Sequence, residues 1–236
     1  MTYEQIYLAI RKRVLHLLHG RYFVVSRQGS RYLLDIRNYI DRQIEATGGY
    51  EKDRIERFLE EMARMECNLF IDIGANLGLY TLAVAKKFPD LDIIAFEPDK
   101  INCAQLHANI FLNTIVDRVK VHAVALSDRS GMASFHRHDD ENRGRSAVRR
   151  DGEIQVPTKT LDSIMTMSGQ RVALKIDVEG HEPEVLLGAR SLLVNNNCLL
   201  QVESFDLSLV EPILSELGYA VKWRIGSDYV FGLRGN

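Results

Sequence analysis

Charged residues alternate along one short apolar stretch, VALKIDVEGHE, at residues 172–182. Lys175, Asp177 and Glu179 are two residues apart, so on a strand they would share one face. Central parallel strands are normally apolar on both faces, so three charges there are costly unless they are paired or used in chemistry. Carboxylates and the imidazole of His181 can take a proton from a hydroxyl group. We therefore predict a catalytic role for all four side chains, and an ion pair between Lys175 and Asp177 is the alternative for the lysine.

A second stretch, LFIDIGANLGLYTLAVAKKF at residues 69–88, has the pattern of a strand, a tight turn and a helix. This order is typical of the first half of a nucleotide-binding βαβ unit. Gly74 and Gly78 would let the backbone approach a ligand closely, and the new helix offers free N–H groups. Ala75 and Asn76 complete the predicted binding turn.

The turn differs from the dinucleotide pattern G-x-G-x-x-G, because it has D-x-G-A-N-x-G without the middle glycine. Asp72 precedes Gly74 by two residues, and its carboxylate would repel a pyrophosphate but suits the ammonium group of an amino acid. S-adenosylmethionine (SAM) carries an adenosine, an amino acid and a sulfonium, and no phosphate. The pattern thus favours SAM. A turn without a ligand is less favoured, since Asp72 would then be a buried charge without a purpose.

The stretch IIAFEPDK, residues 93–100, is a second apolar run that ends in an acid. Glu97 lies 23 residues after Gly74, and an acid at about this distance accepts hydrogen bonds from ribose hydroxyls in dinucleotide folds. Pro98 turns the chain away. The two motifs in this order predict a SAM-binding domain.

Composition sets the outer limits. The chain has 236 residues, of which 46% are hydrophobic and 26% charged, and this is ordinary for one globular domain with an extension. A formal net charge of −2 gives no global field that would favour nucleic acid. Three scattered cysteines, the absence of an apolar run near 18 residues and the lack of a secretory pattern at the N-terminus predict a cytoplasmic protein without a transmembrane segment.

Residues 1–66 are predicted to form an N-terminal extension that caps the site or mediates oligomerisation. An amphipathic helix at 3–19 should pack on its own domain or on a second subunit, which would make a homo-oligomer, and the alternative is a membrane-surface helix. A hairpin at 22–36 and helices at 37–45 and 51–65 should follow.

Residues 67–236 alternate between strand and helix patterns, which predicts an α/β fold with a doubly wound, mostly parallel sheet and a closing antiparallel hairpin. Ligands of such a sheet gather at the carboxyl ends of its strands. The expected strands are 69–75, 92–97, 119–126, 131–136, 154–159, 172–178, 198–204, 219–225 and 228–234. The expected helices are 78–88, 99–113, 160–167, one that starts at Pro183, and 208–217.

The segments FIDIGANLGLYTL, FEPD, ALSDRSG, TLDSI and above all LKIDVEGHEPEVLLGA resemble the FkbM-type methyltransferase family. The likeness covers residues 67–205 and is weaker before them, in YLLDIRNYIDRQI and GGYE. It implies the Rossmann-like fold of SAM methyltransferases and SAM-dependent methylation, mostly of hydroxyl oxygens on saccharides or polyketide-like metabolites. It also implies a methionine-binding role for Asp72, Gly74, Asn76 and Gly78, a ribose-binding role for Glu97, and an adenine-binding role for Asp128.

Methylation of a hydroxyl requires an aligned acceptor and a route for its proton. One route is a side-chain base among Asp177, Glu179 and His181. The other is a divalent metal held by Asp177, Glu179 and Glu203. No close-set acidic pair marks a metal site, so the metal-free base is favoured and no metal ligand is assigned.

The segment 136–152, HRHDDENRGRSAVRRDG, is polar and lies between two expected strands. It is predicted to be a solvated loop, and the alternative is a cap whose arginines bind a carboxylate, sulfate or phosphate on an anionic acceptor. The arginines are Arg137, Arg143, Arg145, Arg149 and Arg150.

Two other functional classes stay open. An NAD-dependent oxidoreductase is disfavoured by the missing glycine and by Asp72. A SAM-fold binding module without catalysis is disfavoured because Asp72, Glu97 and Asp177 are all present.

Overall fold

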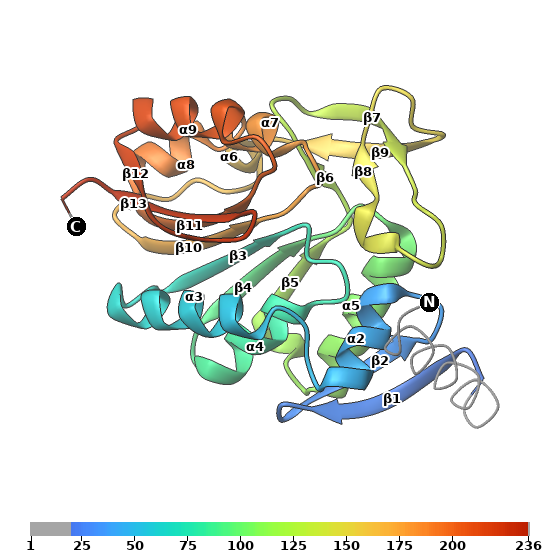
Figure 1. Cartoon of the computed structure of the whole chain (residues 1–236). Helices are drawn as coiled ribbons and strands as arrows, with labels where there is room; N and C mark the ends of the chain where they lie inside the picture. Colours follow the sequence, from blue (N-terminus) through green and yellow to red (C-terminus); the bar gives the residue numbers. More distant parts are fainter. Residues whose placement is uncertain (1–19, 236) are drawn as a thin grey trace.

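The computed structural model describes residues 20–235 (Figure 1). The amphipathic helix expected at 3–19 lies outside this range, so its packing and the homo-oligomer it would form stay predictions. Within the described range, no helix has both the length and the apolar character needed to span a membrane. The cytoplasmic location also remains a prediction.

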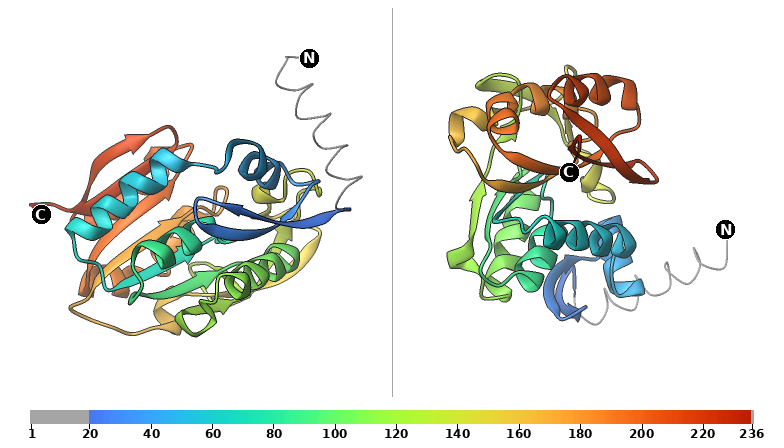
Figure 2. Two further views of the ribbon diagram at one scale, coloured as in Figure 1. Left: turned by 90° about the horizontal axis from the view of Figure 1, so that it is seen from below. Right: turned by 90° about the vertical axis from the view of Figure 1, so that its left-hand side faces the viewer.

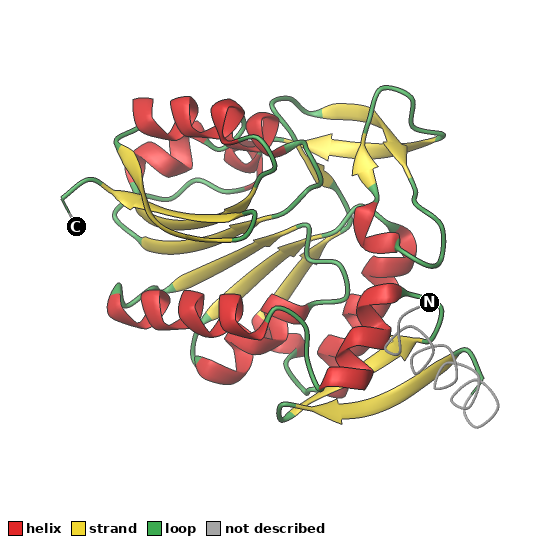
Figure 3. Ribbon diagram, viewed as in Figure 1, coloured by secondary structure: helices red, strands yellow, loops and turns green. Residues whose placement is uncertain are grey.

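A seven-stranded sheet forms the centre of the molecule, in the order β12-β13-β11-β10-β3-β4-β5 (Figure 3). The five strands from β11 to β5 are parallel, and the β12–β13 hairpin adds antiparallel to β11. The predicted doubly wound α/β sheet with a closing hairpin is therefore confirmed. The strands are β3 (Leu69–Ile73), β4 (Asp92–Phe96), β5 (Val119–His122), β10 (Arg171–Ile176), β11 (Asn197–Glu203), β12 (Tyr219–Ile225) and β13 (Asp228–Leu233).

Helices cover both faces of this sheet, with α3, α4 and α5 on one face and α6 to α9 on the other (Figures 1 and 2). Alternate residues of a strand point to opposite faces, so β3 sends Ile71 into one core and Phe70 into the other. Asp72 points to the same side as Phe70, toward α4. The helices are α3 (Lys52–Arg64), α4 (Leu79–Lys87), α5 (Lys100–Leu112), α6 (Leu161–Ile164), α7 (Glu182–Leu187), α8 (Arg190–Asn195) and α9 (Leu207–Glu216).

The front part of the chain packs on the same body. The hairpin of β1 (Tyr22–Arg27) and β2 (Ser30–Asp35) lies against α5, and α2 (Tyr39–Thr47) follows it. In α3, Phe58 and Met62 share a hydrophobic core with Phe70 of the central sheet. The division of the chain after residue 66 stays a prediction, but α3 contributes to the core of the sheet domain.

A small four-stranded sheet, β6-β9-β7-β8, stands beside the carboxyl edge of the central one. Its strands are β6 (Ala125–Leu126), β7 (Gly131–His136), β8 (Ala147–Val148) and β9 (Ile154–Lys159), and β7 pairs antiparallel with β9 as predicted. The expectation of one strand over 119–126 is wrong. The carbonyl of His122 accepts a bond from the Glu97 N–H at the sheet edge, and the chain then turns away to pair β6 with β9.

Candidate active site

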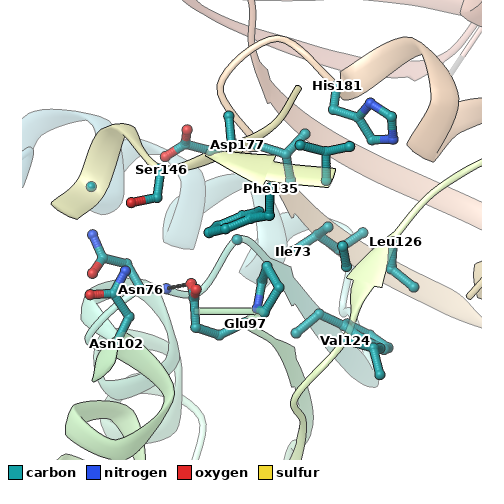
Figure 4. Close-up of a pocket in the computed structure, with 18 of the residues that line it drawn as sticks. Ile73, Asn76, Glu97, Asn102, Val124, Leu126, Phe135, Ser146, Asp177 and His181 are labelled. Atoms are coloured by element: carbon teal, nitrogen blue, oxygen red, sulfur yellow. Dashed lines mark hydrogen bonds between the residues drawn. The ribbon is translucent and has the colours of Figure 1, made fainter. Parts of the chain in front are cut away.

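Two neighbouring cavities open at the carboxyl ends of β3, β4 and β10. The first is lined by the ends of β3 and β4, the segment from Val124 to Leu126 and the small sheet (Figure 4). The second lies between the loop before α3, the start of α4, the segment after β10 and Phe205. Asn76, Gly144 and Asp177 line both cavities, so the two meet at these residues.

The turn after β3 brings the backbone close to the segment after β10. Gly74 has φ of 78°, and a Cβ there would lie 1.8 Å from the carbonyl oxygen of Asp177. Only glycine fits this position, because the space a side chain needs is already filled by backbone. Ala75 and Gly78 follow in the turn, and the N–H groups of Gly74 and Ala75 bind the carbonyl of Phe96.

Asp72 is buried, with 1% of its surface exposed. Its Oδ2 accepts hydrogen bonds from the Thr81 N–H (3.0 Å) and hydroxyl (2.6 Å), so it holds the first turn of α4. Burial raises its pKa, and its Oδ1 has no partner. Asp72 lines neither cavity. Its predicted contact with an ammonium group therefore stays a prediction, and the observed role is to fix the turn.

Glu97 lies on the wall of the first cavity. Its two oxygens accept bonds from the N–H groups of Asn76 (2.7 Å) and Asp99 (2.9 Å). Burial raises the pKa of Glu97 to about 7, against the effect of these two bonds. Pro98 lines the same wall. The backbone of Asn76 has a φ of 52°. The side-chain oxygen of this residue, Oδ1, is buried and has no hydrogen-bond partner.

The rest of the first cavity is largely apolar. Phe96, Val124, Leu126, Phe135 and Val148 line it, which suits a flat ring. Phe135 and Val148 belong to the small sheet, and the sequence did not identify them because their position depends on pairing between distant strands.

Asp128 stands apart from these residues. Its side chain is 38% exposed and it does not line the cavity. Its Oδ1 accepts a bond from the Ser127 hydroxyl (3.1 Å), which also lies 3.0 Å from Nε2 of His181. The adenine-binding role of Asp128 stays a prediction that the observed position does not favour.

Lys175 forms the buried ion pair that was the alternative interpretation of its charge. Its Nζ lies 3.0 Å from Oδ2 of Asp177 and donates to the carbonyl of Gly74 at 3.1 Å. Burial alone would lower the pKa of Lys175, but the carboxylates of Asp177 and Asp72 raise it overall. The lysine thus stays charged and ties the segment after β10 to the turn after β3.

The four residues predicted to be catalytic do not form one group. The strand ends at Ile176, and Glu179 adopts φ of 57°, so the alternation expected for a longer strand is lost. Glu179 lines the second cavity, and its side chain has no hydrogen bond or ion pair with another described residue. His181 lines the first cavity instead, and burial lowers its pKa.

Besides Asp177, three acids line the second cavity: Glu51, Glu179 and Glu203. The sequence analysis did not place these three in one acceptor site. Burial, with repulsion from Asp177, raises the pKa of Glu179 to about 7 and also raises that of Glu203. Glu51 comes from the loop before α3, and Arg54 of α3 pairs with it at 3.0 Å. Within residues 20–235, no three or more histidine, cysteine or acidic side chains are arranged to hold a metal ion. Tyr39, Tyr50 and the exposed Phe205 complete the wall.

The arginines of 136–152 have different roles. Arg143 is 1% exposed, and it binds Asp35 at 2.8 Å and Gln105 at 3.2 Å. Arg137 pairs with Asp99 at 2.5 Å. These two hold the segment to the domain, so the picture of a solvated loop is wrong for them. Arg145 is exposed and lines the second cavity, where its charge acts on Glu179 and opposes the rise of the pKa of that acid.

The fold is the Rossmann-like α/β fold, and a comparison with known sequence families identifies the class of protein. The sequence model of the FkbM methyltransferase domain matches residues 72–221. The chain therefore belongs to the FkbM family of methyltransferases.

Among characterised relatives, the chain is similar to the 2-O-methyltransferase NoeI of Sinorhizobium fredii, with 23% identity over 78% of this chain and 83% of that protein. It is also similar to the hexuronic acid methyltransferase AglP of Haloferax volcanii, with 29% identity over 79% of this chain and 78% of that protein. Among solved structures, the crystal structure of a putative O-methyltransferase from Klebsiella pneumoniae matches with a TM-score of 0.53 and 12% identity, over 98% of this chain and 99% of that one. At this identity the structural match shows the Rossmann-like fold alone.

Proposed function

We propose that this protein is a SAM-dependent O-methyltransferase that acts on a hydroxyl group of a saccharide. The observation that carries the proposal is the meeting of the two cavities at Asp177 and Asn76. A cofactor in the first cavity and an acceptor in the second would approach each other there, as in-line transfer requires.

The residues of the first cavity fit SAM. Glu97 keeps unused lone pairs on the wall for ribose hydroxyls, since each oxygen accepts one backbone bond. The unpartnered Oδ1 of Asn76 can accept a bond from an amino group. The apolar walls around Phe96 and Leu126 suit adenine. When bound, SAM supplies a methyl group on a positively charged sulfur.

Glu179 is the favoured proton acceptor. It lines the second cavity, its carboxylate has no partner, and a pKa of about 7 suits a base that works near neutral pH. Asp177 is held by Lys175 in an ion pair. Its role would be to shape the place where the two cavities meet and to keep a negative charge there. As the acceptor oxygen gains the methyl group, its proton would pass to Glu179.

The wall of the second cavity suits a sugar. Carboxylates and arginines bind vicinal hydroxyls, and Tyr39, Tyr50 and Phe205 offer aromatic faces to a pyranose ring. The name of NoeI, a 2-O-methyltransferase, supports an oxygen acceptor, and that of AglP supports an acidic sugar. Arg145 is the residue that would pair with an acidic substituent.

The test combines binding and transfer. Thermal melting should rise with SAM or S-adenosylhomocysteine and not with NAD, because a ligand that prefers the native state stabilises it. Incubation with SAM and a panel of neutral and acidic sugars, read by mass spectrometry, should show one added methyl group. Stabilisation by NAD alone would favour an oxidoreductase. Cofactor binding without transfer to any sugar or fractionated metabolite would favour a binding module.

A further inference from the structure

Backbone strain gathers around the second cavity. Six non-glycine residues in the described range have positive φ, and three of them line this cavity: Glu51 (55°), Asn76 (52°) and Glu179 (57°). Asparagine adopts this conformation readily, but glutamate does so at an energetic cost. Such conformations persist where the surrounding structure holds them and often occur at functional sites. Glu51 is thus held in a costly conformation on the wall of the acceptor cavity.

The contacts of Glu51 do not show that the fold requires its costly positive φ. Its carboxylate lies 3.0 Å from Nη1 of Arg54, but the same nitrogen lies 2.6 Å from Oδ2 of Asp228. Nη1 of Arg54 donates its hydrogen bond to Oε1 of Glu51, and the buried Asp228 is close enough to form an ion pair with the same nitrogen. The Glu51 side chain makes no capping bond to the backbone N–H groups of the first turn of α3. The other carboxylate oxygen of Glu51, Oε2, has no bond to another described residue and is available on the cavity wall.

The electrostatic surroundings of Glu51 are unfavourable to its charge. Burial raises the pKa of Glu51 to about 7, against the attraction of Lys175, and repulsion from Asp177 and Asp228 adds to the rise. An acid whose pKa is raised on folding binds more protons in the folded state, so stability falls as pH rises from about 4.5 to 7. A neutral side chain at this position would make the ligand-free protein more stable above pH 7. Residues that lower stability in this way are typical of functional sites.

We propose that Glu51 binds a second hydroxyl group of the acceptor sugar and thereby determines which hydroxyl is methylated. This inference rests on the proposed function. Glu179 would stand at the reacting hydroxyl, and Glu51, with Arg54 beside it, would accept a hydrogen bond from another hydroxyl of the same ring. The N-terminal part of the chain would then supply specificity to the active site.

The test compares Glu51→Gln with Glu56→Gln. Both residues are close to or in the first turns of α3, but Glu56 is exposed and lies outside the acceptor cavity. The methyl glycosides of glucose and glucuronic acid serve as acceptors, and the positions methylated are mapped by NMR. We expect Glu51→Gln to raise the acceptor KM about 10-fold or more and to spread methylation over further hydroxyls. Its kcat should change less than about 3-fold and its affinity for S-adenosylhomocysteine should not change. Glu56→Gln should behave as the wild type.

Thermal unfolding at pH 5 and pH 8 gives a second readout that needs no acceptor. Glu51→Gln should gain melting temperature relative to the wild type at pH 8 and little at pH 5. Glu51→Gly, which also relieves the positive φ, should fold at least as well and should lose the same acceptor selectivity.

Three results would overturn the role of Glu51: an unchanged KM and product pattern in the folded variant, a loss of stability at pH 8, or a wild-type protein that binds S-adenosylhomocysteine but methylates neither sugar. A wild-type protein that does not bind S-adenosylhomocysteine at all would reject the proposed function itself, and the two failures are thus distinguishable.

Discussion

The two cavities that meet at Asp177 are built in different ways. In the first, the buried acid Glu97 is satisfied by two backbone N–H groups, and the remaining wall is mainly apolar. In the second, Glu51, Glu179 and Glu203 share one space with Asp177, and burial raises the pKa of all three. In the proposed function, the first cavity holds the cofactor with a few fixed contacts. The second would bind hydroxyl groups and accept a proton.

The difference also lies in where the residues come from. The hydrogen bonds that Glu97 makes on the wall of the first cavity belong to two local motifs, in which a strand end is followed by a turn. The wall of the second is assembled from six separated segments, from Tyr39 to Phe205. A cavity of the second kind can change its acceptor without changing the cofactor motif.

The largest effect expected in this comparison is on catalysis. Glu179→Gln keeps the shape of the side chain and removes its basicity, so kcat should fall by about 10²–10⁴ while SAM affinity stays the same. In the wild type, kcat should rise with pH through about 7 as Glu179 ionises, and this rise should be absent in the variant. Single-turnover assays and calorimetry measure the two quantities.

Asp177→Asn and His181→Ala are the variants to compare with Glu179→Gln, again by kcat and SAM affinity. Asp177 lines both cavities, so its variant should lose SAM affinity as well as kcat, and His181→Ala should affect only cofactor binding. If Glu179→Gln keeps a near-normal kcat, the proton leaves by another residue, and Asp177 becomes the first candidate.

Two arginines of one segment should differ sharply in their effect on stability. Arg143 is buried and its loss leaves buried polar partners, so Arg143→Gln should lower the free energy of unfolding by roughly 3 kcal/mol. Arg145→Gln should leave stability unchanged and raise the KM of an acidic sugar but not of a neutral one. Urea unfolding and acceptor kinetics check the pair. Equal stability losses would show that Arg145 also holds the fold, and an unchanged KM would remove it from the acceptor site.

The sequence predicted the sheet, its order of helices and strands, and the place of Glu97 at the end of β4, because each depends on local patterns of apolar residues and turns. It did not predict the break between β5 and β6 or the buried position of Arg143, which depend on pairing with β9 and with Asp35. It also treated Lys175, Asp177, Glu179 and His181 as one group. Lys175, Asp177 and Glu179 do line one cavity, but His181 lines the other, because β10 ends at Ile176 and Glu179 has positive φ, and neither can be deduced from residue types.

A smaller effect is expected from substitution of Glu97, and it concerns the affinity for SAM. Glu97→Ala should weaken SAM binding by roughly 1.5–3 kcal/mol, the range for hydrogen bonds to a charged group. Because the ionised carboxylate accepts hydroxyl bonds best and its pKa is about 7, wild-type affinity should increase from pH 6 to pH 8. Glu97→Gln should show a flat profile. Calorimetry of a folded variant with unchanged affinity would assign the ribose to another residue.

The smallest effect is expected from a chelator. A divalent metal would have to bind among Glu51, Asp177, Glu179 and Glu203, but Lys175 and Arg54 already supply positive charge next to two of these acids. In residues 20–235, these carboxylates are not grouped with the spacing that a metal ion needs. We therefore expect EDTA to leave the methylation rate unchanged and added magnesium to do nothing. Glu203→Gln should then change acceptor KM rather than create or remove a metal requirement. A rate that disappears with EDTA and returns with magnesium would turn Asp177, Glu179 and Glu203 from base and binding groups into metal ligands, and would make the second cavity the site of Lewis-acid chemistry.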